Sequence, residues 1–531
     1  MATRRDALRS LFAVAVLATL GSGLASAAGR KVKIGIALPP GNAAKGATLA
    51  AEEARQTAGL LHVDLEIGPA APTDTIRVVE TTPAKDLPFL VLTVGDPSGP
   101  VRPRVFHVAS QHRGPRQVDW RPDLERFGAE QLNQRFRRRF GMPMDEQAWR
   151  GWVAVKIAAE LVLRAPAGSD PASALATMSF DGHKGEQLSF DPQDHHLVRR
   201  QGREGQQGRQ GIPGSAVPGV PAVPAVPPPG SLAWVSNERA GTVTVIDTAT
   251  DKVVATVKLG FRPRGIEVSP DGRRVYVALS DTARNAQGPG DAIVALDAAT
   301  CKLVARYDAG TDPERFAVSH DGSRLYASNE DAGTATITDL KKRKVLSALV
   351  VGIEPEGVAL SPDGHWVYVT AETSNTVSVI DTRTERVVAS FLVDPRPRAA
   401  AFSPDGRRAY VTAEIGGTVS VIDTVRHQVM RSIPIPGAHP VGIVVSPDGK
   451  RVYVANGHGN AVSVLDASSG RVLASIPVGK RPWGIAVTPD GRKIYTANGV
   501  SNNVSVIDAV TLKPIATIPA GDGAWGVAIG R

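Results

Sequence analysis

The sequence predicts a multidomain protein in which a C-terminal all-β propeller of seven blades follows a smaller α/β domain. The main observation is a Ser-Pro-Asp-Gly tetrapeptide that recurs, with small changes, six times after residue 268. Its aspartates lie 50, 42, 42, 43 and 42 residues apart, a spacing typical of propeller repeats. Pro-Asp-Gly between apolar runs favours a tight hairpin turn. The chain of 531 residues is also too long for one ordinary core. The six aspartates are Asp271, Asp321, Asp363, Asp405, Asp448 and Asp490.

Residues 1–28 have the pattern of a cleaved export signal. Arg4 and Arg5 form a positive start, residues 11–20 are apolar, and residues 25–27 read Ala-Ser-Ala. The paired arginines leave both the Sec and the twin-arginine (Tat) route open. The chain has one cysteine, Cys301, so no disulfide forms within it, and such a composition suits a bacterial periplasm. We expect no membrane span once the signal is removed.

Residues 29–200 are predicted to form the α/β domain. Strands are expected at residues 31–38, 61–67 and 89–94, with a helix at 44–58 between the first two. This order indicates a parallel sheet. Two further helices are expected at about 123–140 and at 149–163, where apolar residues recur at helical spacing.

The same region resembles a known family. KIGIALPP, KGATLAAEEARQTAG and VDLEI are similar to the opening of type I periplasmic substrate-binding proteins. AWRGWVAVKIAAELV and FDGHKGEQLSFDPQDHHL resemble the branch associated with alcohol dehydrogenases that depend on pyrroloquinoline quinone (PQQ). The resemblance covers about half the length of such a protein, because the central section is missing between Asp96 and Gln111. We therefore expect a truncated domain and carry over no ligand residue.

Residues 201–230 are predicted to be a linker. Glycine falls at every third position from Gly202 to Gly214, and a Val-Pro-rich run follows to Gly230. We expect a semi-rigid polyproline spacer, reaching about 3.1 Å per residue where extended. A collagen-like triple helix is the alternative, disfavoured by the short run.

Residues 231–531 contain the repeats, each with four strand segments named a to d. Segment a precedes the turn, b follows it, c ends in an aspartate, and d leads to the next a. The array starts with b, c and d and ends with a lone a, so the blade count is seven only if the two chain ends share one blade. Closing a propeller in this way leaves no exposed sheet edge in the ring. The aspartates ending segment c are Asp247, Asp297, Asp339, Asp381, Asp423, Asp466 and Asp508.

FSPDGRRAYVT at 402–412 and VYVAN at 452–456 resemble the signature of the YVTN family of β-propellers. Such propellers also occur in PQQ-dependent alcohol-oxidation systems, so both resemblances imply one context. They imply a quinoprotein dehydrogenase or a transport component as the partner. PQQ is the cofactor implied by association only.

Candidate site residues are sought where the blades differ, because a residue present in every blade serves the blade itself. The d-to-a loops carry a proline whose flanking residues change from blade to blade. We expect the arginines of these loops to hold an anionic ligand and the tryptophans to stack on an aromatic one. The competing interpretation is a solvated rim of weak salt bridges, with acids of blades two and three paired to arginines of blades one and four. The candidates are Arg262, Arg264, Arg398, His439, Arg481, Trp483 and Trp525.

The leading prediction of function is an exported binding or scaffold protein accessory to PQQ-dependent alcohol oxidation, with a small organic ligand or a protein partner on the d-to-a face. The alternatives are a propeller lactonase of the 6-phosphogluconolactonase type, a haem d1 redox propeller and a solute-binding component of an ABC-type uptake system. No catalytic residue or metal ligand is assigned, since no Ser-His-Asp spacing is recognisable. The basic run at 135–139 lacks interleaved aromatics, which argues against nucleic acid despite a formal charge of +9.

Overall fold

The computed structural model describes residues 32–71, 76–79, 90–94, 102, 104–108, 120, 129–165, 169–183, 185–199, 231–281 and 290–530. The chain divides into two compact units, residues 1–200 and 201–531. The predicted export signal and linker lie outside the described residues. In the described part, no helix combines the length and apolarity needed to cross a membrane.

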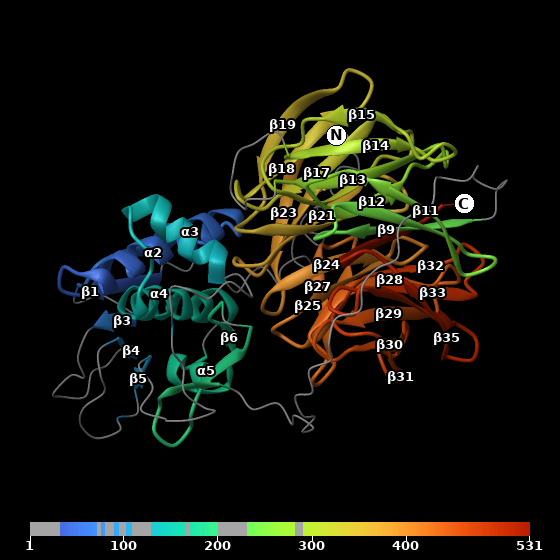
Figure 1. The fold of residues 1–531 in the computed structure, drawn as a ribbon. Helices are drawn as coiled ribbons and strands as arrows, with labels where there is room; N and C mark the ends of the chain where they lie inside the picture. The colour runs from blue at the N-terminus through green and yellow to red at the C-terminus, as the bar shows by residue number, and fades with distance from the viewer. Residues whose placement is uncertain are drawn as a thin grey trace, which may run out of the picture. The chain divides into compact units, whose positions relative to one another are not determined.

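The first unit contains the predicted parallel sheet, with the strand order β2-β1-β3-β4-β5 (Figure 1). Three strands were predicted: β1 (Val32–Ala37), β2 (Leu65–Pro69) and β4 (Leu90–Thr93). The pattern missed β3 (Ile76–Val79) and β5 (Val105–His107), which are too short to show a clear period. The resemblance to substrate-binding proteins stays a prediction for this unit.

Helices α2 (Asn42–Leu60) and α4 (Glu146–Arg164) pack closely against each other. A Cβ atom on Gly46 would lie 1.7 Å from the Ala148 carbonyl oxygen, and one on Gly151 would lie 1.9 Å from that of Ala43. The two glycines therefore permit this contact between the helices. The remaining elements are α3 (Ala129–Phe140), α5 (Pro171–Thr177) and an antiparallel sheet of β6 (Phe180–Asp181), β7 (Gln187–Phe190) and β8 (Leu197–Arg199).

The second unit is a ring of seven four-stranded antiparallel sheets, which confirms the predicted propeller (Figure 1). The strands of each blade are given from the inner strand a to the outer strand d. Blade one has β12 (Arg262–Val268), β13 (Arg274–Ser280), β14 (Ala292–Asp297) and β15 (Leu303–Tyr307). Blade two has β16 (Pro313–Val318), β17 (Arg324–Asn329), β18 (Thr334–Asp339) and β19 (Lys344–Val350). Blade three has β20 (Pro355–Leu360), β21 (Trp366–Ala371), β22 (Thr376–Asp381) and β23 (Arg386–Leu392).

Blades four to six continue the same order. Blade four has β24 (Pro397–Phe402), β25 (Arg408–Ala413), β26 (Thr418–Asp423) and β27 (Gln428–Pro434). Blade five has β28 (Pro440–Val445), β29 (Arg451–Asn456), β30 (Ala461–Asp466) and β31 (Val472–Pro477). Blade six has β32 (Pro482–Val487), β33 (Lys493–Asn498), β34 (Asn503–Asp508) and β35 (Lys513–Pro519).

Blade seven closes the ring as predicted, because it is built from both ends of the array. Its strands are β36 (Ala524–Ile529), β9 (Leu232–Asn237), β10 (Thr242–Asp247) and β11 (Lys252–Lys258). Strand β36 pairs antiparallel with β9, with Val527 opposite Val235. Each inner strand also contacts the inner strands of its two neighbouring blades. The pairing of the chain ends therefore holds the ring shut.

The repeated residues have structural roles, as the comparison between blades predicted. In the turn of blade three, Ser361 Oγ donates to Asp363 and accepts from the backbone N–H of Trp366 at 2.9 Å. The aspartate that ends strand c caps the next turn; Asp508, for example, accepts from Val510 N at 2.9 Å and from Thr511 N at 2.6 Å. Seven apolar clusters each join two adjacent blades. The residues that repeat in every blade therefore form the turns, the caps and the core of the propeller.

Candidate functional site

The d-to-a loops lie at the start of the inner strands, and their ring is called the channel mouth below. In blades two to six the residue before the proline has a positive φ although it is not glycine. This left-handed conformation is uncommon for such residues. The side chains on either side of the proline meet at one point in blade one, where Arg262 and Arg264 both contact Glu238 at 2.8 and 3.2 Å. The residues with positive φ are Asp312, Glu354, Arg396, His439 and Arg481.

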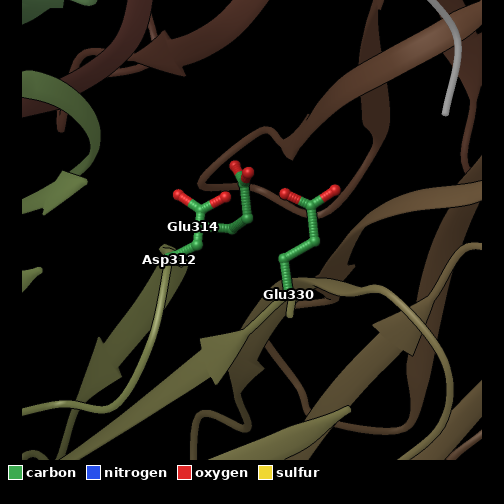
Figure 2. A group of neighbouring side chains, drawn as sticks. All are labelled: Asp312, Glu314 and Glu330. Carbon is green, nitrogen blue, oxygen red and sulfur yellow. The ribbon is translucent and has the colours of Figure 1, made fainter. Parts of the chain in front are cut away.

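One group of charges centres on Arg264. Three carboxylates of blade two, those of Asp312, Glu314 and Glu330, converge within 4.8 Å of one another (Figure 2). Arg264 Nη1 contacts all three, at 3.6 Å from Asp312 and from Glu330 and more closely from Glu314. The guanidinium already supplies the positive charge that a cation would supply, so the cluster does not require a metal ion.

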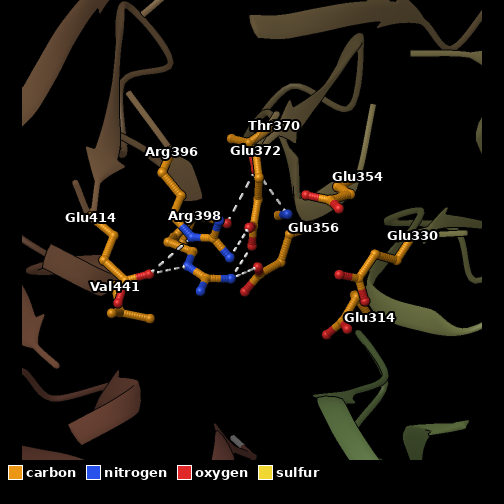
Figure 3. Close-up of polar contacts among 12 residues, drawn as sticks. Glu314, Glu330, Glu354, Glu356, Thr370, Glu372, Arg396, Arg398, Glu414 and Val441 are labelled. Atoms are coloured by element: carbon orange, nitrogen blue, oxygen red, sulfur yellow. Dashed lines mark hydrogen bonds and ion pairs between the residues drawn. The ribbon is translucent and has the colours of Figure 1, made fainter. Parts of the chain in front are cut away.

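A second group centres on Arg398 of blade four (Figure 3). Arg398 Nη1 contacts the carboxylates of Glu356 and Glu372, and its Nε donates to Glu414 at 2.6 Å. Arg396 Nη2 lies 2.6 Å from Glu372. Glu414 also accepts from outside this blade, at 2.9 Å from Arg481 Nη2 of blade six. The network therefore links blades three, four and six around the mouth.

Burial and neighbouring charge divide the carboxyl groups into two kinds. Burial opposes ionisation of Glu414, but Arg398, Arg481 and Arg396 together hold the pKa of Glu414 well below its usual value. Burial, with the Asp312 charge, raises the pKa of Glu330 to about 7. Burial also raises the pKa of Glu372 well above its usual value, against the pull of Arg396 and Arg398. A carboxyl group with a pKa near 7 exchanges a proton at neutral pH.

These contacts confirm that acids of blades two and three pair with arginines of blades one and four. They show that a solvated rim was the wrong description, since every side chain of the two groups is 17% exposed or less. The difference arises from the b-to-c loops. The glutamates of these loops pair with the arginines of the d-to-a loops and shield them from solvent. Those glutamates are Glu238, Glu330, Glu372 and Glu414.

The candidate tryptophans lie together and next to arginines. The ring centroids of Trp483 and Trp525 are 6.0 Å apart with planes inclined by 19°. The guanidinium groups of Arg481 and Arg398 lie over Trp483, at 4.5 and 5.2 Å from its ring centroid. Trp525 is buried, whereas Trp483 is partly exposed. The expected stacking wall is thus partly covered by the arginines themselves.

His439, the remaining candidate, lies apart from these contacts and packs on another histidine. The ring centroids of His439 and His458 are 4.9 Å apart with planes inclined by 64°. Both belong to blade five, which carries Val441 where other blades carry a charged or aromatic side chain.

Sequence comparison missed Arg315, the second residue after the proline of blade two. The other six blades have Gly265, Gly357, Ala399, Gly442, Gly484 and Gly526 at this position. The reason is close packing of the inner strands: a Cβ atom on Gly484 would lie 2.5 Å from the Trp525 carbonyl oxygen. The signal for Arg315 in the sequence is an arginine at a position where the other six blades carry glycine or alanine.

Arg315 extends across the channel. Its guanidinium carbon lies 4.7 Å from the ring centroid of Trp525, which belongs to blade seven on the far side of blade one. Its Nε and Nη2 are shielded from solvent, and neither has a hydrogen-bond partner among the described residues. Burial lowers the pKa of Arg315, yet an arginine remains charged under all ordinary conditions. The mouth therefore holds a cation with two unused donors.

Two family models match parts of the propeller. A model described as Lactonase, 7-bladed beta-propeller, matches residues 394–512. A model described as Choice-of-anchor I domain matches residues 231–391. No match was found among curated proteins.

Solved structures with a similar fold share 18–24% identity with this chain. Hydrazine synthase of Kuenenia stuttgartiensis is 24% identical over 50% of this chain and 89% of its own, with a TM-score of 0.45. A protein of unknown function from Desulfotomaculum acetoxidans is 18% identical over 56% and 99%, with a TM-score of 0.48. A candidate 6-phosphogluconolactonase from Bacteroides uniformis is 20% identical over 56% and 99%, with a TM-score of 0.49.

Proposed function

We propose that the propeller binds a small organic carboxylate at the channel mouth, with Arg315 as the primary contact. The observation that carries this proposal is the shielded guanidinium whose Nε and Nη2 lack acceptors. Buried donors left unpaired cost about 1–3 kcal/mol each, and more when charged. A carboxylate satisfies Nε and Nη2 together, because the guanidinium fork matches its two oxygens.

The surroundings of Arg315 favour a single anionic group on an apolar or planar body. Arg264 and Arg398 are each held by several carboxylates and are thereby neutralised. Arg315 has the Glu356 charge nearby and lies over the face of Trp525, and its Nε and Nη2 have no acceptor among the described residues. Trp483 beside it is partly exposed and offers aromatic surface to the rest of the ligand.

Isothermal titration of the full chain with benzoate, cyclohexanecarboxylate and inorganic phosphate tests the proposal. We expect a carboxylate to bind and Arg315→Gln to weaken it at least tenfold, the ~1.4 kcal/mol expected when a charge-assisted hydrogen bond is lost. Arg426→Gln is the matched control, because Arg426 is exposed and pairs with nearby Asp423. Equal affinities in both variants, or binding of phosphate alone, would refute a carboxylate site at Arg315.

A second candidate function is lactone hydrolysis, which is favoured by the lactonase model and by Glu330. With its pKa near 7, Glu330 is suited to accept a proton from water as the oxygen attacks the lactone carbonyl carbon. Arg264 Nη1, 3.6 Å from Glu330, is placed to stabilise the negative charge that forms on the carbonyl oxygen. The ring C–O bond then breaks as Glu330 returns the proton to the leaving oxygen, and the product is a hydroxy acid whose carboxylate Arg315 is able to hold.

A pH-stat assay with glucono-δ-lactone separates the two candidates. Hydrolysis predicts turnover by the wild type and a loss of about 100-fold or more in Glu330→Gln. Activity that survives in Glu330→Gln contradicts the assigned role. If the wild type has no activity on this lactone or on γ-butyrolactone, carboxylate binding remains and hydrolysis is rejected.

Export and a partnership with a quinoprotein dehydrogenase are further proposals that rest on the sequence. They are supported by the signal-like residues 1–28 and by the two family resemblances. Cell fractionation with a C-terminal tag tests export: recovery of a shortened chain in the periplasm is expected, and a full-length cytoplasmic chain would contradict it. Co-purification with a PQQ enzyme tests the partnership.

A further inference from the structure

The end of the channel opposite the mouth contains a cavity of 470 Å³. Four inner strands, β12, β16, β20 and β36, contribute to its wall where they approach the a-to-b turns. A volume of this size suits a small organic molecule. Its lining includes the apolar side chains of Val268, Phe316, Val318, Leu360 and Ile529.

Glu267 is the one carboxylate among the described lining residues. It occupies the fourth position after the proline of blade one, and the equivalent residues of the other blades are Ala317, Ala359, Ala401, Val444, Ala486 and Ala528. The repeat therefore favours a small apolar residue at this position, and a carboxylate has no role in building the blade. As with Arg315, a charged side chain replaces a small one on an inner strand.

Glu267 lacks the arginine counter-ions that Glu314, Glu356 and Glu414 have at the mouth. Its Oε1 accepts one long hydrogen bond, 3.4 Å from Val318 N. No described arginine or lysine forms an ion pair with it, and burial raises the pKa of Glu267 to about 8. His320 is the other titratable group among the described lining residues, and its Nε2 lies 3.1 Å from the Ser361 carbonyl oxygen. His320 is therefore engaged by the wall, and Glu267 is the group that meets a ligand.

We propose that this cavity is a second binding site, separate from the channel mouth, for a primary amine carried on an apolar body. The ammonium group would pair with the Glu267 carboxylate, and the apolar side chains of the wall would contact the body. An amine fits better than a metal ion, because one carboxylate in an apolar wall offers too few oxygen ligands for a hard cation. It also fits better than a neutral apolar molecule, which would leave Glu267 unpaired.

The proposal makes a specific prediction about protons. At pH 7 Glu267 in the empty cavity holds its proton, and an ammonium group would favour the carboxylate. Binding should therefore release about 0.9 proton per molecule at pH 7 and almost none at pH 9.5, where Glu267 is already ionised. An alkylamine remains mostly charged over this range, since its pKa is similar to the lysine value of about 10.4.

Isothermal titration of the full chain with cyclohexylmethylamine, in phosphate and in Tris, measures both affinity and proton release. We expect binding with proton release, at least tenfold weaker binding of the neutral analogue cyclohexylmethanol, and a similar loss in Glu267→Gln. Glu267→Gln should also abolish the difference between the two buffers. Ala359→Leu, which fills part of the cavity, should weaken the amine and the alcohol alike.

Arg426→Gln, at an exposed arginine outside both proposed sites, is the control and should leave amine binding unchanged. Three results would overturn the proposal: no binding of the amine to the wild type, equal affinity for amine and alcohol, or unaltered amine binding in Glu267→Gln. Glu267→Gln preserves the shape of the side chain, so we expect the variant to fold. Circular dichroism of the variant would detect a loss of fold. In that case Ala359→Leu decides, since unchanged amine binding there excludes the cavity.

Discussion

Replacing Arg398 by methionine removes the guanidinium that joins three carboxylates and retains an apolar stem of similar length. Glu356, Glu372 and Glu414 then remain buried with fewer counter-ions. Breaking a buried ion pair by removing one partner costs about 3–5 kcal/mol. We therefore expect the free energy of unfolding of the propeller to fall by about 3–5 kcal/mol at pH 8, measured by urea titration with circular dichroism.

The cost should depend on pH, and the sign follows from the pKa shifts. In the wild type the pKa of Glu414 lies well below its usual value, so its contribution is present above about pH 4.3 and is lost as pH falls further. In Arg398→Met the buried carboxyls have raised pKa values, so the folded state holds protons that the unfolded state has released. The destabilisation should therefore be largest at pH 8 and should shrink towards pH 5.

Arg426→Met is the matched control, because the Arg426 side chain is 61% exposed in its ion pair with Asp423. That exposed pair should contribute less than about 0.5 kcal/mol. A loss below about 1 kcal/mol in Arg398→Met at pH 8, or an equal loss at pH 5 and pH 8, would refute a desolvated network at the mouth.

Three further predictions concern ring closure, the strand caps and the mouth. Deleting residues 524–531 removes β36 and exposes one edge of β9, so the propeller should lose its cooperative urea transition and aggregate in size-exclusion chromatography. A deletion variant that unfolds like the wild type would contradict closure by that strand. Asp508→Ala should lower the urea midpoint, because two backbone N–H groups lose their acceptor, and an unchanged midpoint would count against that cap. Because the folded pKa of Glu330 is raised to about 7, wild-type stability should fall from pH 5 to pH 8, and Glu330→Gln should show a smaller fall. An identical pH profile would exclude a raised pKa at Glu330.

The propeller was predictable because its signals are local and repeated. The turn aspartates set the period, and the order of the first and last segments predicted that β36 pairs with β9. The acid–arginine pairs between adjacent blades were also predictable, since neighbouring d-to-a loops must lie side by side in a ring. Short strands of the first unit, such as β3 (Ile76–Val79), carry too few residues to show a period.

Burial and long-range partners were not predictable from one sequence. The contact of Glu414 with Arg481 spans blades that are not adjacent and depends on side-chain length across the mouth. The shielding of the arginines depends on glutamates of the b-to-c loops, which reach the same charges from a different part of each blade. Arg315 and Glu267 were missed because comparison of the blades concentrated on the residues flanking the proline. Extending it two to four positions along the inner strand reveals both as single charged residues among glycine, alanine and valine.

The central claim is that Arg315 holds a carboxylate at the channel mouth, and a crystal structure of the protein with benzoate or cyclohexanecarboxylate tests it most directly. The account predicts carboxylate oxygens at about 2.7–2.9 Å from Nε and Nη2 of Arg315, in a two-point contact. It further predicts the ligand body against the exposed part of Trp483. A carboxylate bound elsewhere, with Nε and Nη2 of Arg315 still lacking an acceptor, would contradict the account.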